Sequence, residues 1–396
     1  MTFSLEMHQF YAPTRLIHGA GSVKRVGVEA SSLGGSRVLV VSDEGVARAG
    51  LLEGIVESLE EERLPVEIFT DVPQDPGVAC VTRGVEVLRS MRADLVVGVG
   101  GGSPMCAAKA IALVATNGGT IRDYEGFGKA TRPPLPTICI PTTAGSGTEV
   151  SAVTIITDED RHVKMAIGTP LAYPPLAILD PELLLTLPFR QAAVSGADAL
   201  SHAIEACLTT QATPLTDALA LGAIRLLARN LIRAAKTSDL PAKGACLLGS
   251  SMANMACGNA RLGLNHALTW PISSLFGVPH GLANGIMLPY VLEFILPEAA
   301  EAMSRVAIAL GEEPDGVPVE ELAWRGVVRI KNLLRDLGIP THFNSDQLDP
   351  ERIPDMVEML LGEGIYSFFR RITLKVAGPE DLTHLYERSL QGWNTQ

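Results

Sequence analysis

The 396-residue chain has few aromatic residues, a deficit of basic residues and no long hydrophobic run. Aromatic residues make up only 5% of the chain while glycines number 38, a balance that favours an α/β protein with tight turns over a β-sandwich. Its 32 Lys and Arg residues against 44 Asp and Glu residues give a net charge of −12. That charge disfavours nucleic acid and anionic membrane as partners, because both attract a basic surface. Each strongly apolar stretch is interrupted before it reaches the roughly 20 residues of a membrane span.

The six cysteines are scattered, and no two of them form a Cys-x-x-Cys pair. Thiolate zinc sites and redox-active dithiols depend on such closely spaced pairs, so we expect neither. Scattered cysteines in a long chain are usually reduced and buried, and the first residues do not have the basic-then-apolar pattern of a signal sequence. We therefore expect a cytoplasmic protein.

Short apolar segments alternate with helical ones in the first half of the chain, which indicates a parallel sheet covered by helices on both faces. Four of these segments are candidate strands: 37–41, 66–69, 94–99 and 137–140. After about residue 185 the apolar spacing is almost entirely helical. We therefore place a domain boundary at Leu187-Pro188, with an α/β domain over 1–187 and a helical domain over 188–396.

A glycine-rich loop, Gly100-Gly101-Gly102-Ser103, separates the third candidate strand from a helical segment. Glycines allow a phosphate to approach the backbone, and a helix N-terminus offers it free N–H groups and partial positive charge. Ser103 is predicted to cap that helix. The G-x-G-x-x-G fingerprint is incomplete, because Ser103 occupies its last glycine position. A phosphate site and a plain strand-to-helix turn therefore both remain open.

Two further features suit a dinucleotide. Asp43 follows the first candidate strand, where a carboxylate can bind both hydroxyls of an adenosine ribose and repel a 2′-phosphate. This favours NAD over NADP, although Asp43 could instead simply cap the next helix. After the fourth strand, the segment from Thr142 to Ser151 interleaves hydroxyl residues with glycines. The alternative for this segment is an ordinary solvated loop.

Four residues have the chemistry and spacing of a metal site. Asp198 and His202 are four apart in a helical segment, so they share one helix face. His266 and His280 are fourteen apart in the second half of the chain. One Asp and three His would bind a divalent transition metal such as Fe²⁺ or Zn²⁺. The alternative is a surface Asp/His pair together with hydrogen-bonded core histidines.

The chain resembles the iron-containing, group III alcohol dehydrogenases over nearly its whole length. The opening FYAPTRLIHGAGS is similar to that family's start, and four segments carry the resemblance: GGGSPMCAAKAIA, PTTAGSGTEVS, GADALSHAIEA and GLNHALTWPISSLFGVPHGLANGIMLP. It implies a Rossmann-like, dinucleotide-binding α/β domain, mostly of parallel sheet, followed by an all-helical domain, in a dehydroquinate-synthase-like architecture with the site in the cleft between them. It further implies hydride transfer between NAD(H) and an alcohol/aldehyde pair, Fe²⁺ or alternatively Zn²⁺ as the metal, and a homo-oligomer, a dimer or larger.

The resemblance also assigns roles to individual residues. It makes Asp43 the ribose-binding acid and Lys164 a residue that reaches the cofactor ribose. The remaining cofactor residues lie in the two loops: Gly100, Gly101, Gly102, Ser103, Thr142, Thr143, Ser146 and Ser151. The implied metal ligands, which are also catalytic, are Asp198, His202, His266 and His280.

Two positions depart from the family pattern. Cys106 stands where the family usually has an Asp near the nicotinamide, and Trp270 stands where many members have a His one helical turn after the third ligand. We expect Trp270 to lie over the substrate pocket and to favour apolar or flat substrates. Because an indole cannot accept a proton, we expect the proton of the alcohol to leave by another route. Alternatives on the same scaffold are a maleylacetate-reductase-like enzyme, a dehydroquinate-synthase-like lyase and a non-catalytic NAD-binding protein.

Overall fold

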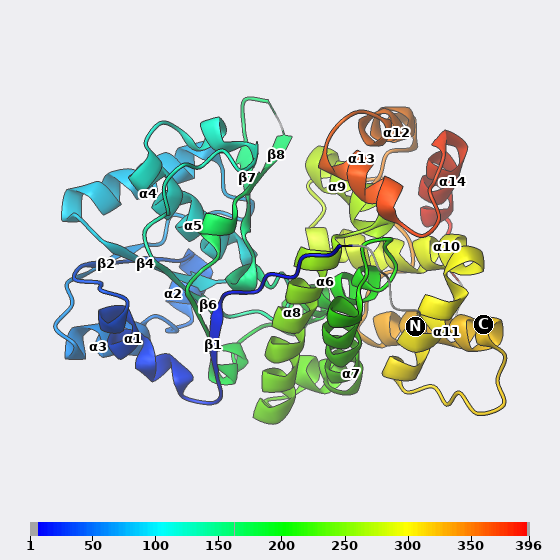
Figure 1. Ribbon diagram of the computed structural model, residues 1–396, viewed down its shortest axis with the longest axis horizontal. Helices are drawn as coiled ribbons and strands as arrows, with labels where there is room; N and C mark the ends of the chain where they lie inside the picture. The colour runs from blue at the N-terminus through cyan, green and yellow to red at the C-terminus, as the bar shows by residue number, and fades with distance from the viewer. Residues whose placement is uncertain (1–6, 162, 394–396) are drawn as a thin grey trace. The chain divides into compact units, whose positions relative to one another are not determined.

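The computed structural model describes residues 7–161 and 163–393 (Figure 1). The chain divides into two compact units, Ala12–Leu187 and Pro188–Gln396, and the segment up to Tyr11 groups with the second. Each unit is described by itself. Within the described residues, no helix has an apolar stretch long enough to cross a membrane.

The first unit is built on a six-stranded parallel sheet, as the sequence predicts for this half of the chain. In spatial order its strands are β1 (Arg15–His18), β9 (Leu176–Leu179), β6 (Thr137–Pro141), β4 (Leu95–Gly100), β2 (Val38–Val41) and β3 (Val66–Phe69). The four central strands are buried along their whole length, which is why they appear in the sequence as continuous apolar runs. The fold class is therefore confirmed.

The helices of this unit follow the strands in sequence. They are α1 (Val26–Ser32), α2 (Glu44–Arg48), α3 (Glu53–Glu61), α4 (Val78–Met91) and α5 (Gly102–Asn117). A smaller sheet contains β5 (Gly126–Phe127), β8 (Val163–Gly168) and β7 (Val153–Asp158), with β7 and β8 antiparallel. The sequence analysis did not predict this sheet, nor β1 and β9.

Register brings three strand ends together in the main sheet. Val41 of β2 pairs with Gly98 of β4, and Gly100 at the end of β4 pairs with Pro141 at the end of β6. The loops that follow β2, β4 and β6 therefore share one edge of the sheet, where the carboxyl ends of parallel strands usually form ligand sites.

The second unit is helical in its described residues, apart from turns and a single isolated bridge. Its helices are α6 (Phe189–Ala206), α7 (Pro214–Lys236), α8 (Leu240–Ala260), α9 (Leu264–Phe276), α10 (His280–Leu310), α11 (Val319–Asp336), α12 (Ile353–Leu361), α13 (Ile365–Ile372) and α14 (Pro379–Ser389). Capping residues define where some of these helices begin. At the start of α7 the Thr213 side chain accepts a hydrogen bond from the N–H of Thr216, and Pro214 occupies the first turn. The apolar spacing of the sequence does not mark α9, α13 or the first part of α10 as separate helices. Proline inside α9 and α10 interrupts the expected pattern.

The assignment of the N-terminal segment needs correction. The sequence predicts one domain over residues 1–187, but residues 7–11 group with the second unit. Its backbone is tied there because the Tyr11 N–H donates to Asn259 Oδ1 over 2.7 Å and Asn259 Nδ2 donates to the Tyr11 carbonyl over 3.2 Å. No periodic pattern in a short extended segment could indicate such a distant partner.

Candidate active site

The first glycine loop has the backbone conformation that requires glycine. Gly100 has φ +143°, and a Cβ at that position would lie 2.6 Å from Pro104 Cγ. The following helix, α5, has Gly101 rather than Ser103 at its N-cap, so the predicted cap is wrong. The Ser103 hydroxyl instead accepts a hydrogen bond from the Asp75 N–H over 3.2 Å. The N-terminus of α5 is therefore bordered by glycine backbone, as a pyrophosphate site requires.

The second loop lies directly beside the first. The Thr142 N–H donates to the Gly100 carbonyl over 3.0 Å. A Cβ on Gly101 would lie 3.5 Å from Thr143 Oγ1, and one on Gly102 would lie 3.1 Å from Ser146 Oγ. Larger residues at these glycines would therefore fill the space between the two loops. This narrow cradle of backbone and hydroxyl groups fits a dinucleotide's pyrophosphate.

Asp43 caps the helix that follows it, and its role as a ribose-binding acid stays a prediction. Its Oδ1 accepts from the Val46 N–H over 2.9 Å and so caps α2. Its Oδ2 lies 3.4 Å from the position that a Cβ on Gly100 would occupy. One carboxylate oxygen thus serves the helix while the other is next to the first glycine loop, where a ribose hydroxyl donor could reach it.

Lys164 and Ser151 also lie in this unit, on or beside the small sheet. Lys164 is in β8, largely buried, and its Nζ is 2.9 Å from Asp75 Oδ1. Because the Asp75 N–H binds Ser103, Asp75 connects Lys164 to the first glycine loop. The Ser151 hydroxyl accepts from the Val153 N–H over 3.1 Å, at the start of β7.

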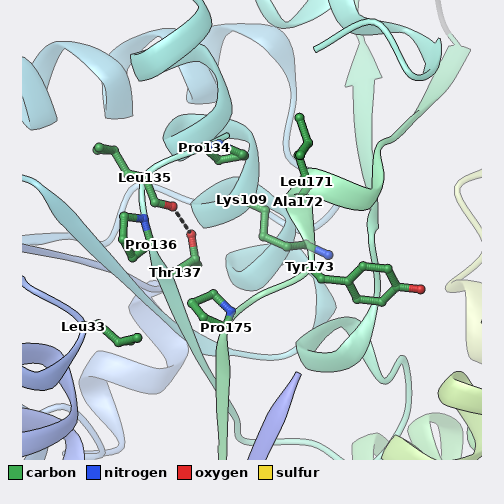
Figure 2. Close-up of a pocket in the computed structure, with 10 residues that line it drawn as sticks. All are labelled: Leu33, Lys109, Pro134, Leu135, Pro136, Thr137, Leu171, Ala172, Tyr173 and Pro175. Atoms are coloured by element: carbon green, nitrogen blue, oxygen red, sulfur yellow. Dashed lines mark hydrogen bonds between the residues drawn. The ribbon is translucent and has the colours of Figure 1, made fainter. Parts of the chain in front are cut away.

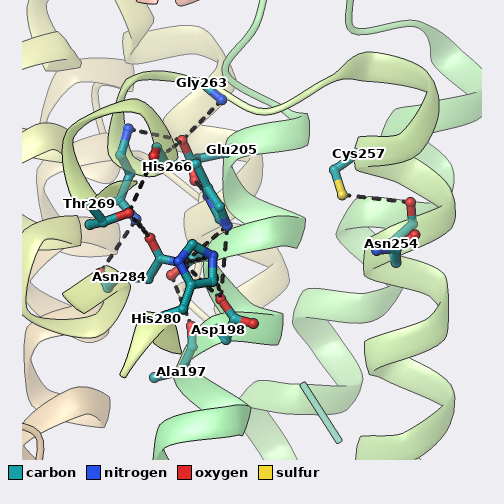
Figure 3. Close-up of polar contacts among 12 residues, drawn as sticks. Ala197, Asp198, Glu205, Asn254, Cys257, Gly263, His266, Thr269, His280 and Asn284 are labelled. Atoms are coloured by element: carbon teal, nitrogen blue, oxygen red, sulfur yellow. Dashed lines mark hydrogen bonds and ion pairs between the residues drawn. The ribbon is translucent and has the colours of Figure 1, made fainter. Parts of the chain in front are cut away.

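Three helices of the second unit carry the predicted metal ligands, and Figure 3 shows three of them, Asp198, His266 and His280. Asp198 and His202 lie on α6, His266 on α9, and His280 is the first residue of α10. Ligand atoms of Asp198, His202 and His266 all lie within 4.8 Å of one another. Asp198 Oδ1 is 3.8 Å from both His266 Nε2 and His280 Nε2. All but His280 are buried, and the His280 side chain is 33% exposed.

Glu205, which the sequence analysis missed, fixes the orientation of His266. Its Oε2 contacts His266 Nδ1, and its Oε1 accepts backbone N–H groups from Gly263, Asn265 and His266. A carboxylate on Nδ1 places the proton there and leaves the Nε2 lone pair facing Asp198, which is the tautomer that a metal ligand needs. Glu205 is three residues after His202 on α6, so helical spacing was the available signal.

Asn284 is a second residue that sequence reasoning missed. Its Nδ2 donates to Asp198 Oδ1 over 2.7 Å and lies 3.0 Å from His266 Nε2 and 3.1 Å from His280 Nε2. Its Oδ1 accepts from the Thr269 hydroxyl over 2.7 Å, which fixes the amide's orientation. Atoms of Asp198, His266 and His280, from three helices, therefore all lie within 3.1 Å of the Asn284 amide nitrogen. One carboxylate with imidazole nitrogens is a donor set that suits a divalent transition metal.

The electrostatics keep Asp198 charged. Burial by itself would raise the pKa of the Asp198 carboxyl, but His202, His280 and His266, with the Asn284 hydrogen bond, hold that pKa below its ordinary value. Burial would lower the pKa of His266, but the Glu205 carboxylate outweighs it and raises that pKa. An anionic carboxylate beside imidazoles is the charge arrangement that attracts a cation.

The two departures from the family pattern have defined surroundings. Trp270 lies on α9 one turn after His266, partly buried, with its ring centroid 4.2 Å from that of Tyr366 on α13. Cys106 is a buried residue of α5 whose carbonyl accepts from Thr154 Oγ1 over 3.1 Å. The residues predicted to bind the cofactor thus lie in the first unit and those predicted to bind the metal lie in the second, and the cleft between the domains stays a prediction.

Comparisons with known proteins agree over nearly the whole length of the chain. The sequence model described as iron-containing alcohol dehydrogenase matches residues 13–181, and the model of that family's C-terminal part matches residues 192–388. NAD-dependent methanol dehydrogenase of Bacillus methanolicus is 34% identical over 97% of this chain and 100% of its own. 1,3-Propanediol dehydrogenase of Citrobacter freundii is 35% identical over 91% and 94%. A crystal structure of 1,3-propanediol oxidoreductase superposes with a TM-score of 0.93 at 32% identity, covering 97% of this chain and 100% of that one.

Proposed function

Because the chain belongs to the family of iron-containing alcohol dehydrogenases, we propose that its metal is held by Asp198, His202, His266 and His280. The chain is a metal-dependent oxidoreductase that transfers a hydride between NAD(H) and an alcohol/aldehyde pair. The observation that supports the ligand assignment is the convergence of one buried carboxylate and imidazole nitrogens from three helices. Fe²⁺ is the metal we expect, and Zn²⁺ is the alternative.

The protein's own groups have separate tasks in this reaction. A divalent metal at this position supplies Lewis acidity, which lowers the pKa of an alcohol. Asp198 contributes the negative charge of the site, while Glu205 and Asn284 hold the side chains of His266 and Asp198 in place. These fixed contacts orient the site before substrate arrives, so little reorganisation is needed during the reaction.

We assign NAD(H) binding to the carboxyl edge of the main sheet. The backbone of Gly101 and Gly102 at the N-terminus of α5 binds the pyrophosphate, with Thr142, Thr143, Ser146 and Ser151 of the second loop beside it. Asp43 accepts the adenosine ribose hydroxyls through Oδ2, because its Oδ1 already caps α2. Lys164 reaches a cofactor ribose from its place beside Asp75.

For the substrate, we propose apolar or flat alcohols and aldehydes. Trp270 and Tyr366 form an aromatic pair one helical turn from His266, and Phe369 adds a ring 6.3 Å from Tyr366. Such a surface favours apolar groups through packing. Indole has a donor N–H but no basic nitrogen, so Trp270 cannot take up the proton of the alcohol. Water along the cofactor ribose hydroxyls is the proposed route for that proton.

The decisive test is a metal assay of anaerobically purified protein combined with an NADH-oxidation screen over aldehydes. We expect about one Fe²⁺ or Zn²⁺ per chain and NADH oxidation that depends on it. Turnover that persists after complete metal removal, shown by elemental analysis, would overturn the ligand assignment. Reduction of small polar aldehydes in preference to apolar ones would overturn the substrate proposal alone.

We further infer a cytoplasmic homo-oligomer, a dimer or larger. All six cysteines are free and buried, which suits a reducing compartment. The oligomeric state rests on the family resemblance, and sedimentation velocity of the purified protein tests it. A single species with the 42.0 kDa mass of one chain would rule it out.

A further inference from the structure

Lys109 is a buried lysine in the first unit whose role the reaction does not explain. It lies in the middle of α5, and 2% of its surface is exposed. Its Nζ donates to three backbone carbonyls, those of Thr148, Ser151 and Val153, over 3.2, 2.9 and 2.7 Å. These three contacts use all the N–H donors of an ammonium group. All three acceptors lie in the segment where the second cofactor loop ends and β7 begins.

Burying the Lys109 ammonium costs free energy, so the three hydrogen bonds that it donates must offset that cost. Burial lowers the pKa of the Lys109 ammonium, while Cys106, Cys139 and Glu149 act in the opposite direction. An apolar side chain of similar length would fill the space without the cost of desolvating a charge. The distinctive contribution of Lys109 is therefore its attachment of α5 to three carbonyls.

The second loop is consequently fixed at both of its ends. At its beginning, the Thr142 N–H binds the Gly100 carbonyl of the first loop. At its end, Lys109 holds the carbonyls of residues 148, 151 and 153. Between the two attachments lies Ser146, next to Gly102 at the start of α5. The helix that carries Lys109 thus begins at the proposed pyrophosphate site and fixes the second wall of that site.

We propose that Lys109 is a positioning residue for the cofactor, which sets NAD(H) affinity by holding the second loop against the first. This inference rests on the proposed cofactor role of the two loops. Without the ammonium, the carbonyls of Thr148, Ser151 and Val153 lose their hydrogen bonds to the middle of α5. Ser146 and Ser151 would then sample positions farther from the first loop. Cofactor binding would have to order them, which weakens affinity.

The surroundings of Lys109 leave room for substitutions at this position. The residue also lines a cavity of about 280 Å³, whose other walls are mainly proline and aliphatic side chains (Figure 2). Among them are Leu33, Pro134, Pro136 and Pro175. This space can admit the larger guanidinium of Lys109→Arg, which keeps the charge but changes the direction of its donors. Lys109→Met keeps the length and removes every donor.

The experiment compares these variants in the full-length, metal-loaded protein. For Lys109→Met we expect the NADH dissociation constant, measured by fluorescence titration, to rise about 10- to 100-fold, as the loss of hydrogen bonds from a charged group suggests. Amide hydrogen exchange over residues 142–151 should become faster, while metal content and kcat at saturating NADH stay within about threefold of wild type. Lys109→Arg should have a smaller rise in the dissociation constant.

Lys243→Met is the matched control. Lys243 is a buried lysine of α8 whose Nζ donates to the Ala234 carbonyl over 2.8 Å, in the helical unit. The Lys243→Met substitution should lower the melting temperature of the protein without changing the NADH dissociation constant. If Lys109→Met does not fold, Lys109→Arg and Lys109→Gln carry the test. A folded Lys109 variant with faster loop exchange and an unchanged NADH dissociation constant overturns the role of Lys109. A wild-type protein that does not bind NADH overturns the cofactor assignment itself.

Discussion

The glycine loops of the first unit and the histidine cluster of the second are built in different ways. The loops use backbone groups and short hydroxyl side chains, each loop continuous in sequence with the end of a strand. The histidine cluster uses long side chains from α6, α9 and α10, and its partners are up to 86 residues apart, as for Asn284 and Asp198. One binding region is thus local and the other is assembled by packing.

This difference predicts how each region responds to change. A backbone site loses little when one hydroxyl side chain is removed, because the remaining N–H groups still face the ligand. A site made of a few convergent side chains loses ligand affinity steeply when any one of them is removed. Removal of a residue that supports them weakens binding nearly as much. The predictions below test this contrast, beginning with the cluster.

His280→Ala should have the largest effect. Removal of one imidazole leaves three candidate ligands and should abolish most metal binding, with a fall in kcat of roughly 1,000-fold or more, because Lewis acidity supplies several kcal/mol. Elemental analysis and steady-state kinetics on the same sample measure both. His384→Ala, an exposed histidine on α14, is the control and should behave as wild type. Normal metal content with normal turnover in His280→Ala would exclude this residue from the site.

Glu205→Gln should have the second-largest effect. It tests whether metal binding depends on a side chain that holds His266 in place. The amide keeps the shape and can still accept the backbone N–H bonds, but it removes the charge that holds the proton on His266 Nδ1. We expect metal affinity to fall by about 10- to 100-fold, measured by competition with a chelator. Glu363→Gln, an exposed glutamate in the same unit, should leave metal affinity unchanged. Equal affinity in Glu205→Gln and wild type would mean that Glu205 serves only the backbone.

Asp43→Asn tests the cofactor region and should have a moderate effect. Asn retains the N-cap but removes the charge that a 2′-phosphate would meet, so the ratio of NADPH to NADH efficiency should rise roughly tenfold. Asp43→Gly should raise it too, with only a few tenths of a kcal/mol lost at the cap. Kinetics with both cofactors supply the ratio. A wild-type enzyme that already uses NADPH as well as NADH would show that the Asp43 assignment is wrong.

Trp270 variants should have the smallest effect on catalysis. Trp270→Ala removes the ring that stacks on Tyr366 and should change KM for large or aromatic substrates by about three- to tenfold. Trp270→His should widen acceptance toward small polar alcohols and add a pH-dependent step near the ordinary His pKa of about 6.5. A substrate series assayed across pH, with melting curves, separates these effects. A large drop in melting temperature with an unchanged substrate profile would identify Trp270 as a packing residue.

The sequence by itself determined the local chemistry of this protein. Apolar β-branched runs specified buried parallel strands, and Gly100 appeared where the chain must take φ +143°. The resemblance supplied the family, which the comparisons confirmed, and four candidate ligands, of which Asp198, His202 and His266 form one group while His280 lies 3.8 Å from Asp198. These features are readable because each depends on neighbouring residues or on a motif of fixed spacing.

Tertiary structure alone decided which distant groups support those motifs. Glu205 beside His266, Asn284 at the centre of the cluster and Lys109 beneath the second loop are ordinary residues in the sequence. The tertiary structure also places Gly101 instead of Ser103 at the N-cap of α5. It brings the Tyr11 backbone within hydrogen-bond distance of Asn259. A hydrogen-bond partner far along the chain is selected by how helices and strands pack, and no local pattern of hydrophobicity or spacing records that packing.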